Sequence, residues 1–179
     1  MSLALIPNLL TLARVALAPI VIAAVLRAEY TAALWILLAA GLTDVLDGWL
    51  ARRFGWNSRL GAYLDPVADK ILLSGVYIAL GIAGAVPWWL VGIIFGRDVA
   101  ILGGAGVVFV ITGNRNFPPS VWGKVSTLVQ AATALTLLAR PGSDLLRELL
   151  IWLVAAAAIG SGLDYLRRAL RRAEPSRAR

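Results

Sequence analysis

Four aspartates within apolar segments are the residues of this chain best suited to chemistry. Asp44 and Asp47 lie in TDVLDGWLARR, and Asp65 and Asp69 lie in GAYLDPVADK. An ionised carboxylate in a membrane helix is costly unless it faces a water-filled cavity or a cation. A structural role explains four such groups poorly, so the aspartates indicate a metal site.

Helical spacing gathers each aspartate pair with small residues on one face of a helix. The residues that share the first face are Asp44, Asp47, Gly48, Ala51 and Arg52. Those that share the second face, one every four residues, are Gly61, Asp65 and Asp69. A short turn near Asn57 separates the two segments, so we expect the two faces to meet.

Converging carboxylates repel one another without a counter-charge, and their oxygen-only ligation suits Mg²⁺, Mn²⁺ or Ca²⁺. Two such ions can clamp a pyrophosphate, neutralise charge on its bridging oxygens and lower the pKa of an attacking hydroxyl. The alternatives are a structural network with Arg14, Lys70 and Arg97, or a pathway for protons or cations. Gly48 and Gly61 would let a headgroup approach the backbone, although small residues also serve helix packing.

The composition is that of an integral membrane protein. The 179 residues are 60% hydrophobic with a mean hydropathy of +0.81, against roughly 45–50% apolar residues in soluble domains. The first apolar run continues into a full-length span without a basic leader, so no cleavable signal peptide is expected. Without Cys or His, thiol nucleophiles, disulfides, imidazole bases and His or Cys zinc sites are excluded.

Apolar stretches of about 20 residues can each cross a bilayer as a helix, and the chain contains six of them. We expect an all-α membrane protein with spans at 8–26, 31–53, 60–83, 87–111, 121–139 and 145–167. No linker or internal repeat divides the chain, which predicts one membrane domain over 1–170 and a basic tail over 171–179.

Basic residues between and beyond the spans predict the orientation. The cytoplasmic face would carry Arg52, Arg53, Arg59, Arg115, Lys124, Arg167, Arg168, Arg171, Arg172, Arg177 and Arg179. The opposite face would carry only Arg27, Arg140 and Arg147. By the positive-inside rule, both ends of the chain should be cytoplasmic in a cytoplasmic (inner) membrane.

Polar residues in other spans are candidate ligands for substrate. Asn8 and Thr11 share a helix with Arg14 and are expected to line a nucleotide pocket, and Arg14 would contact substrate or pair with an aspartate. The remaining candidates for the acceptor or its phosphate are Arg97, Lys124 and Thr127. Arg97 could instead form a neutral pair with Asp98, and Lys124 could be a membrane anchor.

The acidic motif resembles the signature of a known family at every fixed position. Residues 44 to 69 read D-x-x-D-G-x-x-A-R, eight residues, then G-x-x-x-D-x-x-x-D, the signature of the CDP-alcohol phosphatidyltransferases. IPNLLTLARVALAPI and FPPSVWGKVSTLVQ also resemble its first and fifth spans. The resemblance implies a six-helix, dimeric enzyme that moves a phosphatidyl group from CDP-diacylglycerol to an alcohol and releases CMP.

The resemblance also implies roles for individual residues. Asp44, Asp47 and Asp65 would hold two divalent cations, Mg²⁺ or Mn²⁺. Asp69 would be a further ligand and the base that takes the proton of the acceptor hydroxyl. The residues that would contact the CDP moiety are Gly48, Ala51, Arg52 and Gly61.

The family resemblance does not by itself specify which alcohol accepts the phosphatidyl group. Family members that use glycerol 3-phosphate commonly carry a second arginine eight residues after the Arg97 position, where this chain has Ala105. We therefore expect phosphatidylglycerol as acceptor, in cardiolipin synthesis, with phosphatidylglycerophosphate synthesis as the alternative. A small ion-coupled transporter is the alternative from another class. Trp88 and Trp89 look like interfacial anchors, so no nucleic-acid partner is expected.

Overall fold

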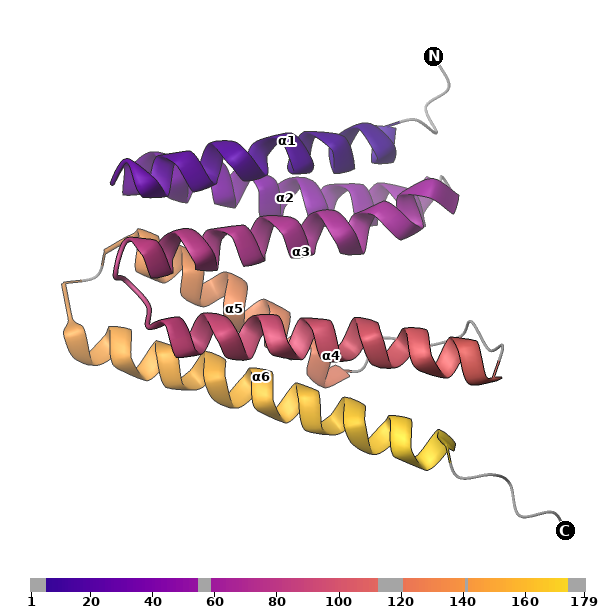
Figure 1. Cartoon of the computed structure of the whole chain (residues 1–179). Coiled ribbons are helices and arrows are strands. Elements are labelled where there is room, and N and C mark those ends of the chain that lie inside the picture. The colour runs from indigo at the N-terminus through magenta and orange to yellow at the C-terminus, as the bar shows by residue number, and fades with distance from the viewer. Residues whose placement is uncertain (1–5, 55–58, 113–120, 141, 174–179) are drawn as a thin grey trace, which may run out of the picture. The chain divides into compact units, whose positions relative to one another are not determined.

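The computed structural model describes residues 6–54, 59–112, 121–140 and 142–173. Within them the regular structure is entirely helical, which confirms the all-α prediction (Figure 1). The helices are α1 (Ile6–Leu26), α2 (Tyr30–Phe54), α3 (Arg59–Ile82), α4 (Trp88–Thr112), α5 (Val121–Leu138) and α6 (Asp144–Ala173). Each coincides with one predicted span.

Two of the described helices are clearly able to cross a membrane by length and composition. They are α5 over Val121–Leu138 and the part of α6 over Asp144–Arg168. Counting only residues whose side chains are described, α1 and α2 contribute shorter apolar stretches, at Leu12–Leu26 and Tyr30–Leu46. Membrane crossing by all six helices stays a prediction.

The chain divides into two compact units. The first comprises Met1–Pro87 and Ala134–Gly142, and the second comprises Trp88–Thr133 and Ser143–Arg179. In the first unit α1 lies against both α2 and α3 (Figure 1). A Cβ added at Gly75 of α3 would lie 2.5 Å from Cδ1 of Ile22 in α1. A glycine at this position thus lets the two helices approach closely.

In the second unit α4 packs against α6. Leu90 and Ile94 of α4 and Val154 of α6 are fully buried. The rings of Trp89 and Trp152 lie beside them with centroids 5.2 Å apart. Large apolar side chains also point outward, with Leu128 71% exposed. Outward apolar residues around a packed interior are typical of helices that face lipid, because lipid tails are as apolar as leucine.

The start and end of α6 follow from local chemistry. Ser143 precedes the helix, and its Oγ accepts a hydrogen bond from the Leu146 N–H at 3.3 Å, as an N-cap does. The helix runs to Ala173, beyond the predicted end at 167. Arginine, leucine and alanine are strong helix formers, and Arg168 pairs with Asp164 one turn earlier at 3.0 Å. The predicted basic tail therefore begins inside α6, and residues 174–179 lie outside the described part of the chain.

Candidate functional site

The first part of the candidate site is an ion pair between α1 and the acidic motif. Arg14 is fully buried in α1, and its Nη1 lies 2.7 Å from Oδ1 of Asp44 in α2. The Asp44 side chain remains 47% exposed. Of the two roles that the sequence left open for Arg14, the structure shows pairing with an aspartate. The guanidinium orients one carboxylate oxygen, while the aspartate stays accessible.

The second aspartate whose side chain is described is Asp69. It lies half-buried in α3, between the buried Ala68 and Leu72. Because α1 contacts both α2 and α3, the two helices that carry the aspartates share one packing partner.

For several predicted site residues, the structure describes the helix that carries them but not their side chains. In α2 and α3 they are Asp47, Gly48, Ala51, Arg52, Gly61 and Asp65, and in α1 they are Asn8 and Thr11. Among the described residues alone, no group of three or more acidic side chains is placed to hold a metal. Their convergence therefore stays a prediction.

The chemistry of the donor set fits a hard divalent cation. All the candidate ligands are carboxylates, and the chain has no Cys or His to favour a softer metal. The 47% exposure of Asp44 shows that its pair with Arg14 does not shut this carboxylate off from a further ligand. Asp44, Asp47, Asp65 and Asp69 are thus the residues that could hold metal ions.

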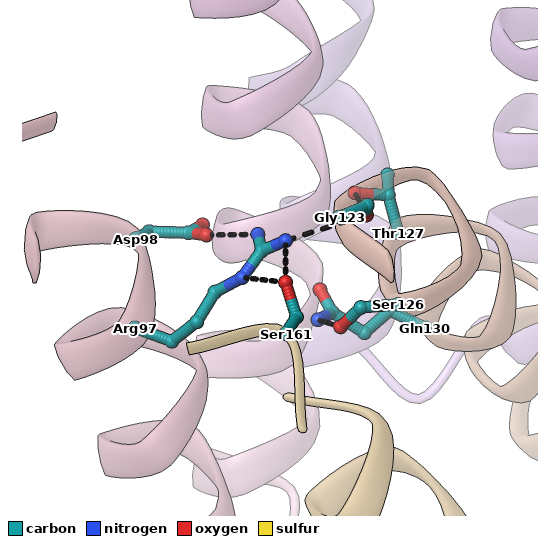
Figure 2. A network of polar contacts seen from close by, with 7 residues as sticks. All are labelled: Arg97, Asp98, Gly123, Ser126, Thr127, Gln130 and Ser161. Atoms are coloured by element: carbon teal, nitrogen blue, oxygen red, sulfur yellow. Dashed lines mark hydrogen bonds and ion pairs between the residues drawn. The ribbon is translucent and has the colours of Figure 1, made fainter. Parts of the chain in front are cut away.

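A separate polar network surrounds Arg97 in the second unit (Figure 2). Arg97 of α4 is 7% exposed. Its Nη1 lies 2.6 Å from Oδ1 of Asp98. Its Nη2 donates to Ser161 Oγ of α6 at 2.8 Å and to the Gly123 carbonyl of α5 at 3.3 Å, and its Nε donates to the same Ser161 Oγ at 3.3 Å. Of the two predicted roles for Arg97, the structure shows the ion pair, extended by contacts to two further helices.

The predicted acceptor residues of α5 lie next to this network. Thr127 Oγ1 donates to the Gly123 carbonyl at 3.1 Å, so Thr127 and Arg97 share one acceptor (Figure 2). Lys124 follows Gly123 and is exposed. Arg14 belongs to the other unit and is described there with Asp44. The structure thus brings Arg97 and Thr127 together and leaves Lys124 accessible beside them.

Sequence reasoning missed Ser161. Its hydroxyl is fully buried and accepts two bonds from Arg97. The available signal was weak: a single serine between glycines, in the apolar run AAAAIGSGL of α6. Serine is common at contacts between membrane helices, and only the packing of α4 on α6 shows which partner this serine has.

The comparisons with known proteins agree with the acidic motif. The family model for CDP-alcohol phosphatidyltransferase matches residues 4–160, which include the motif, Arg97, Gly123 and Thr127 and end one residue before Ser161. The chain belongs to the CDP-alcohol phosphatidyltransferase family.

Its relatives carry two names. The chain is 37% identical over 144 residues, 72% of its length, to the "Probable cardiolipin synthase (CMP-forming)" of Drosophila melanogaster. It is 36% identical over 174 residues, 92% of its length, to the "Probable phosphatidylglycerophosphate synthase" of Mycobacterium tuberculosis. It is 43% identical over 106 residues, 59% of its length, to the "Cardiolipin synthase (CMP-forming)" of Rattus norvegicus.

The matches cover these relatives unequally. The matched region spans 45% of the Drosophila protein and 34% of the rat protein, but 81% of the mycobacterial one. The chain thus spans less than half of each of these two cardiolipin synthases, and the relatives are named for two different products.

Proposed function

We propose that the protein transfers a phosphatidyl group from CDP-diacylglycerol to a glycerol-type acceptor and releases CMP. The observation that carries this proposal is the family match over residues 4–160, within which the acidic motif is complete. In the reaction the acceptor hydroxyl attacks the phosphorus that bears the diacylglycerol. The bond from that phosphorus to the oxygen bridging to CMP breaks, and CMP leaves.

Asp44, Asp47, Asp65 and Asp69 would hold two divalent cations, Mg²⁺ or Mn²⁺. When bound, the ions supply charge neutralisation at the pyrophosphate oxygens. Asp69 accepts the proton of the attacking hydroxyl, a role that suits a half-buried carboxylate. Arg14 holds Asp44 in place through the contact at 2.7 Å. Gly48, Ala51, Arg52 and Gly61, with Asn8 and Thr11, contact the CDP moiety.

Phosphatidylglycerol is the acceptor that we propose, which makes the product cardiolipin. Two observations support it. Ala105 stands where glycerol 3-phosphate users commonly have a second arginine, and the charge of Arg97 is already paired with Asp98 at 2.6 Å. A phosphate dianion would thus meet little free positive charge from α4.

Glycerol 3-phosphate is the second candidate acceptor, with phosphatidylglycerophosphate as product. The observation in its favour is the mycobacterial relative, which bears that name and matches 92% of this chain and 81% of its own length. The exposed Lys124 could supply charge that Ala105 lacks.

We further propose an inner-membrane protein that crosses the bilayer six times, has cytoplasmic ends and acts as a homodimer. The apolar composition and the distribution of Lys and Arg support this topology. CDP-linked lipids are made from cytoplasmic nucleotides, which supports an active site that opens toward the cytoplasm.

The test is CMP release by the purified protein from CDP-diacylglycerol, with Mg²⁺ or Mn²⁺ and with each acceptor separately. Mass spectrometry of the lipids identifies the product. We expect CMP release that requires a divalent cation and is abolished by excess chelator, because four carboxylates cannot share one cavity without counter-charge. Full CMP release in chelator would contradict the two-metal proposal, and no release with any acceptor would contradict the transferase assignment.

A further inference from the structure

The contacts of the Arg97 guanidinium leave it little capacity for a new ligand. They engage Nε–H, both N–H groups of Nη2 and one N–H group of Nη1 (Figure 2). Among the described residues, the only N–H group of Arg97 without a partner is the second one on Nη1. Arginine recognises phosphate best through two parallel N–H groups on one edge. One remaining N–H cannot form that pair.

Ser161 occupies the edge of the Arg97 guanidinium that could otherwise bind phosphate through two parallel N–H groups. Nε and Nη2 form one side of the guanidinium, and both donate to Ser161 Oγ, at 3.3 Å and 2.8 Å. The backbone of α6 lies close at this turn: a Cβ added at Gly162 would be 3.9 Å from Arg97 Cγ. The serine hydroxyl therefore takes the place on this edge that two phosphate oxygens would need.

Ser161 and Asp98 restrain Arg97 in different ways. Asp98 neutralises the charge, whereas Ser161 is neutral and restrains only the geometry of the N–H groups. Removing Asp98 would leave a buried cation without its carboxylate, which is strongly destabilising. Removing the Ser161 hydroxyl changes no charge and frees the bidentate edge, so Ser161 is the residue through which the restraint can be tested.

We propose that Ser161 is a specificity-determining residue that withholds Arg97 from a phosphate dianion. It acts through Arg97 as a positioning residue and disfavours acceptors that carry a phosphate monoester, such as glycerol 3-phosphate. The phosphodiester of a lipid acceptor carries less negative charge than a phosphate monoester. The binding of a lipid acceptor is therefore weakened less when Ser161 holds Arg97. This inference rests on the proposed transferase function and adds a residue that sets its acceptor.

The experiment compares Ser161→Ala with the unmodified protein, using glycerol 3-phosphate and phosphatidylglycerol as separate acceptors. We expect the kcat/KM for glycerol 3-phosphate, divided by that for phosphatidylglycerol, to rise roughly tenfold. This is the low end of the effect expected for one hydrogen bond to a charged group. The rise should come mainly from a lower KM for glycerol 3-phosphate, with kcat nearly unchanged, since Ser161 does not touch the reacting atoms.

Two controls separate this role from a general packing effect. Ser126 of α5 is also fully buried, and its Oγ accepts from Gln130 Nε2 at 3.2 Å rather than from Arg97. Ser126→Ala should therefore leave the acceptor ratio unchanged. Ser161→Ala should also have no effect on the ratio in an Arg97→Lys background, because lysine has no edge with paired N–H groups.

Other results of these measurements would contradict either the role of Ser161 or the proposed function. An unchanged acceptor ratio in Ser161→Ala, or equal losses with both acceptors, would overturn the proposal. If the unmodified protein released no CMP with any acceptor, the proposed function would fail. The role of Ser161 would then be decided by calorimetry with glycerol 3-phosphate alone: tighter binding to Ser161→Ala supports it, and equal binding rejects it.

Discussion

Two buried arginines show how this chain accommodates cations among apolar residues. Arg14 and Arg97 each lie within 3 Å of one carboxylate, at 2.7 Å from Asp44 and 2.6 Å from Asp98. The partners differ in exposure, since the Asp44 side chain is 47% exposed and the Asp98 side chain is 10% exposed. Asp98 therefore serves to neutralise Arg97, whereas Asp44 is held by Arg14 and remains open to another ligand.

At this scale we predict that Asp44→Asn lowers stability as well as activity. The change removes the carboxylate that lies 2.7 Å from the buried Arg14 guanidinium, at a cost of about 1–3 kcal/mol. Thermal unfolding in detergent should therefore show a lower midpoint for the variant than for the unmodified protein. Both are measured in excess chelator, so that bound metal does not contribute to the difference.

The control for this change is Asp144→Asn. The Asp144 side chain is 95% exposed and lies 3.4 Å from Arg147, whose side chain is 48% exposed. Its loss should cost less than about 1 kcal/mol, as expected of a surface pair at the start of a helix. Equal midpoints for the Asp44 and Asp144 variants would show that the Arg14 pair contributes no more to stability than a surface pair does.

A second prediction at the residue scale concerns Asp69. Asp69→Asn should cut turnover by roughly 10²-fold or more, as expected for the loss of a general base. Binding of CDP-diacylglycerol, measured by calorimetry, should remain largely intact. Turnover close to that of the unmodified protein would show that another group takes the proton.

At the scale of the element, α4 and α5 carry the residues that we propose for acceptor choice. The carbonyl of Gly123 accepts from Arg97 at 3.3 Å and from Thr127 at 3.1 Å, so the first turn of α5 is attached to α4. Lys124 follows at once and is exposed. Along α4, Ala105 lies about 12 Å beyond Arg97, since each residue of a helix adds 1.5 Å.

The corresponding prediction is that Ala105→Arg shifts acceptor choice toward glycerol 3-phosphate. A charge-assisted contact to phosphate contributes about 1.5–3 kcal/mol, or roughly 10- to 100-fold in relative efficiency. Competition between the two acceptors at equal concentration, with radiolabelled CDP-diacylglycerol, measures the shift directly. Ala100→Arg, exposed on the same helix but not at the family position, is the matched control.

The unmodified protein in the same competition decides between the proposed acceptors. Predominant cardiolipin would support phosphatidylglycerol as the acceptor. Predominant phosphatidylglycerophosphate would reject that choice and leave the family, the metals and the aspartate roles unchanged.

At the scale of the whole molecule, the distribution of charge predicts the orientation. With six spans, most loop and terminal arginines would fall on the side of the acidic motif, and α6 extends its basic end as helix to Ala173. Helical continuation beyond the apolar stretch would present these arginines to anionic headgroups at the cytoplasmic surface.

We predict that both ends of the chain are cytoplasmic. The chain has no cysteine, so a single introduced cysteine reports its own location. Ser2→Cys and Ser176→Cys should resist a membrane-impermeant thiol reagent in intact cells, because they would lie inside. Gly142→Cys, in the exposed α5–α6 connection, should react. Labelling of either end from outside would reverse the proposed topology.

The sequence determined the elements and the class of chemistry. Apolar runs of helical length predicted all the described helices to within a few residues, except the end of α6, because burying backbone polar groups in lipid allows few alternatives to a helix. The spacing of Asp44, Asp47, Asp65 and Asp69, with the small residues between them, identified the family, which the family model confirms.

Only the tertiary structure decided between the roles that the sequence left open for the arginines. A sequence shows that Arg14 and Arg97 lie among apolar residues and must find partners, but several carboxylates and hydroxyls are possible partners for each. The packing of α1 against α2 selected Asp44 for Arg14. The packing of α4 against α6 placed Ser161, 64 residues away in the chain, on the edge of Arg97. Hydrogen bonds act over about 3 Å, so such pairings depend on how helices pack and cannot be inferred from spacing along the chain.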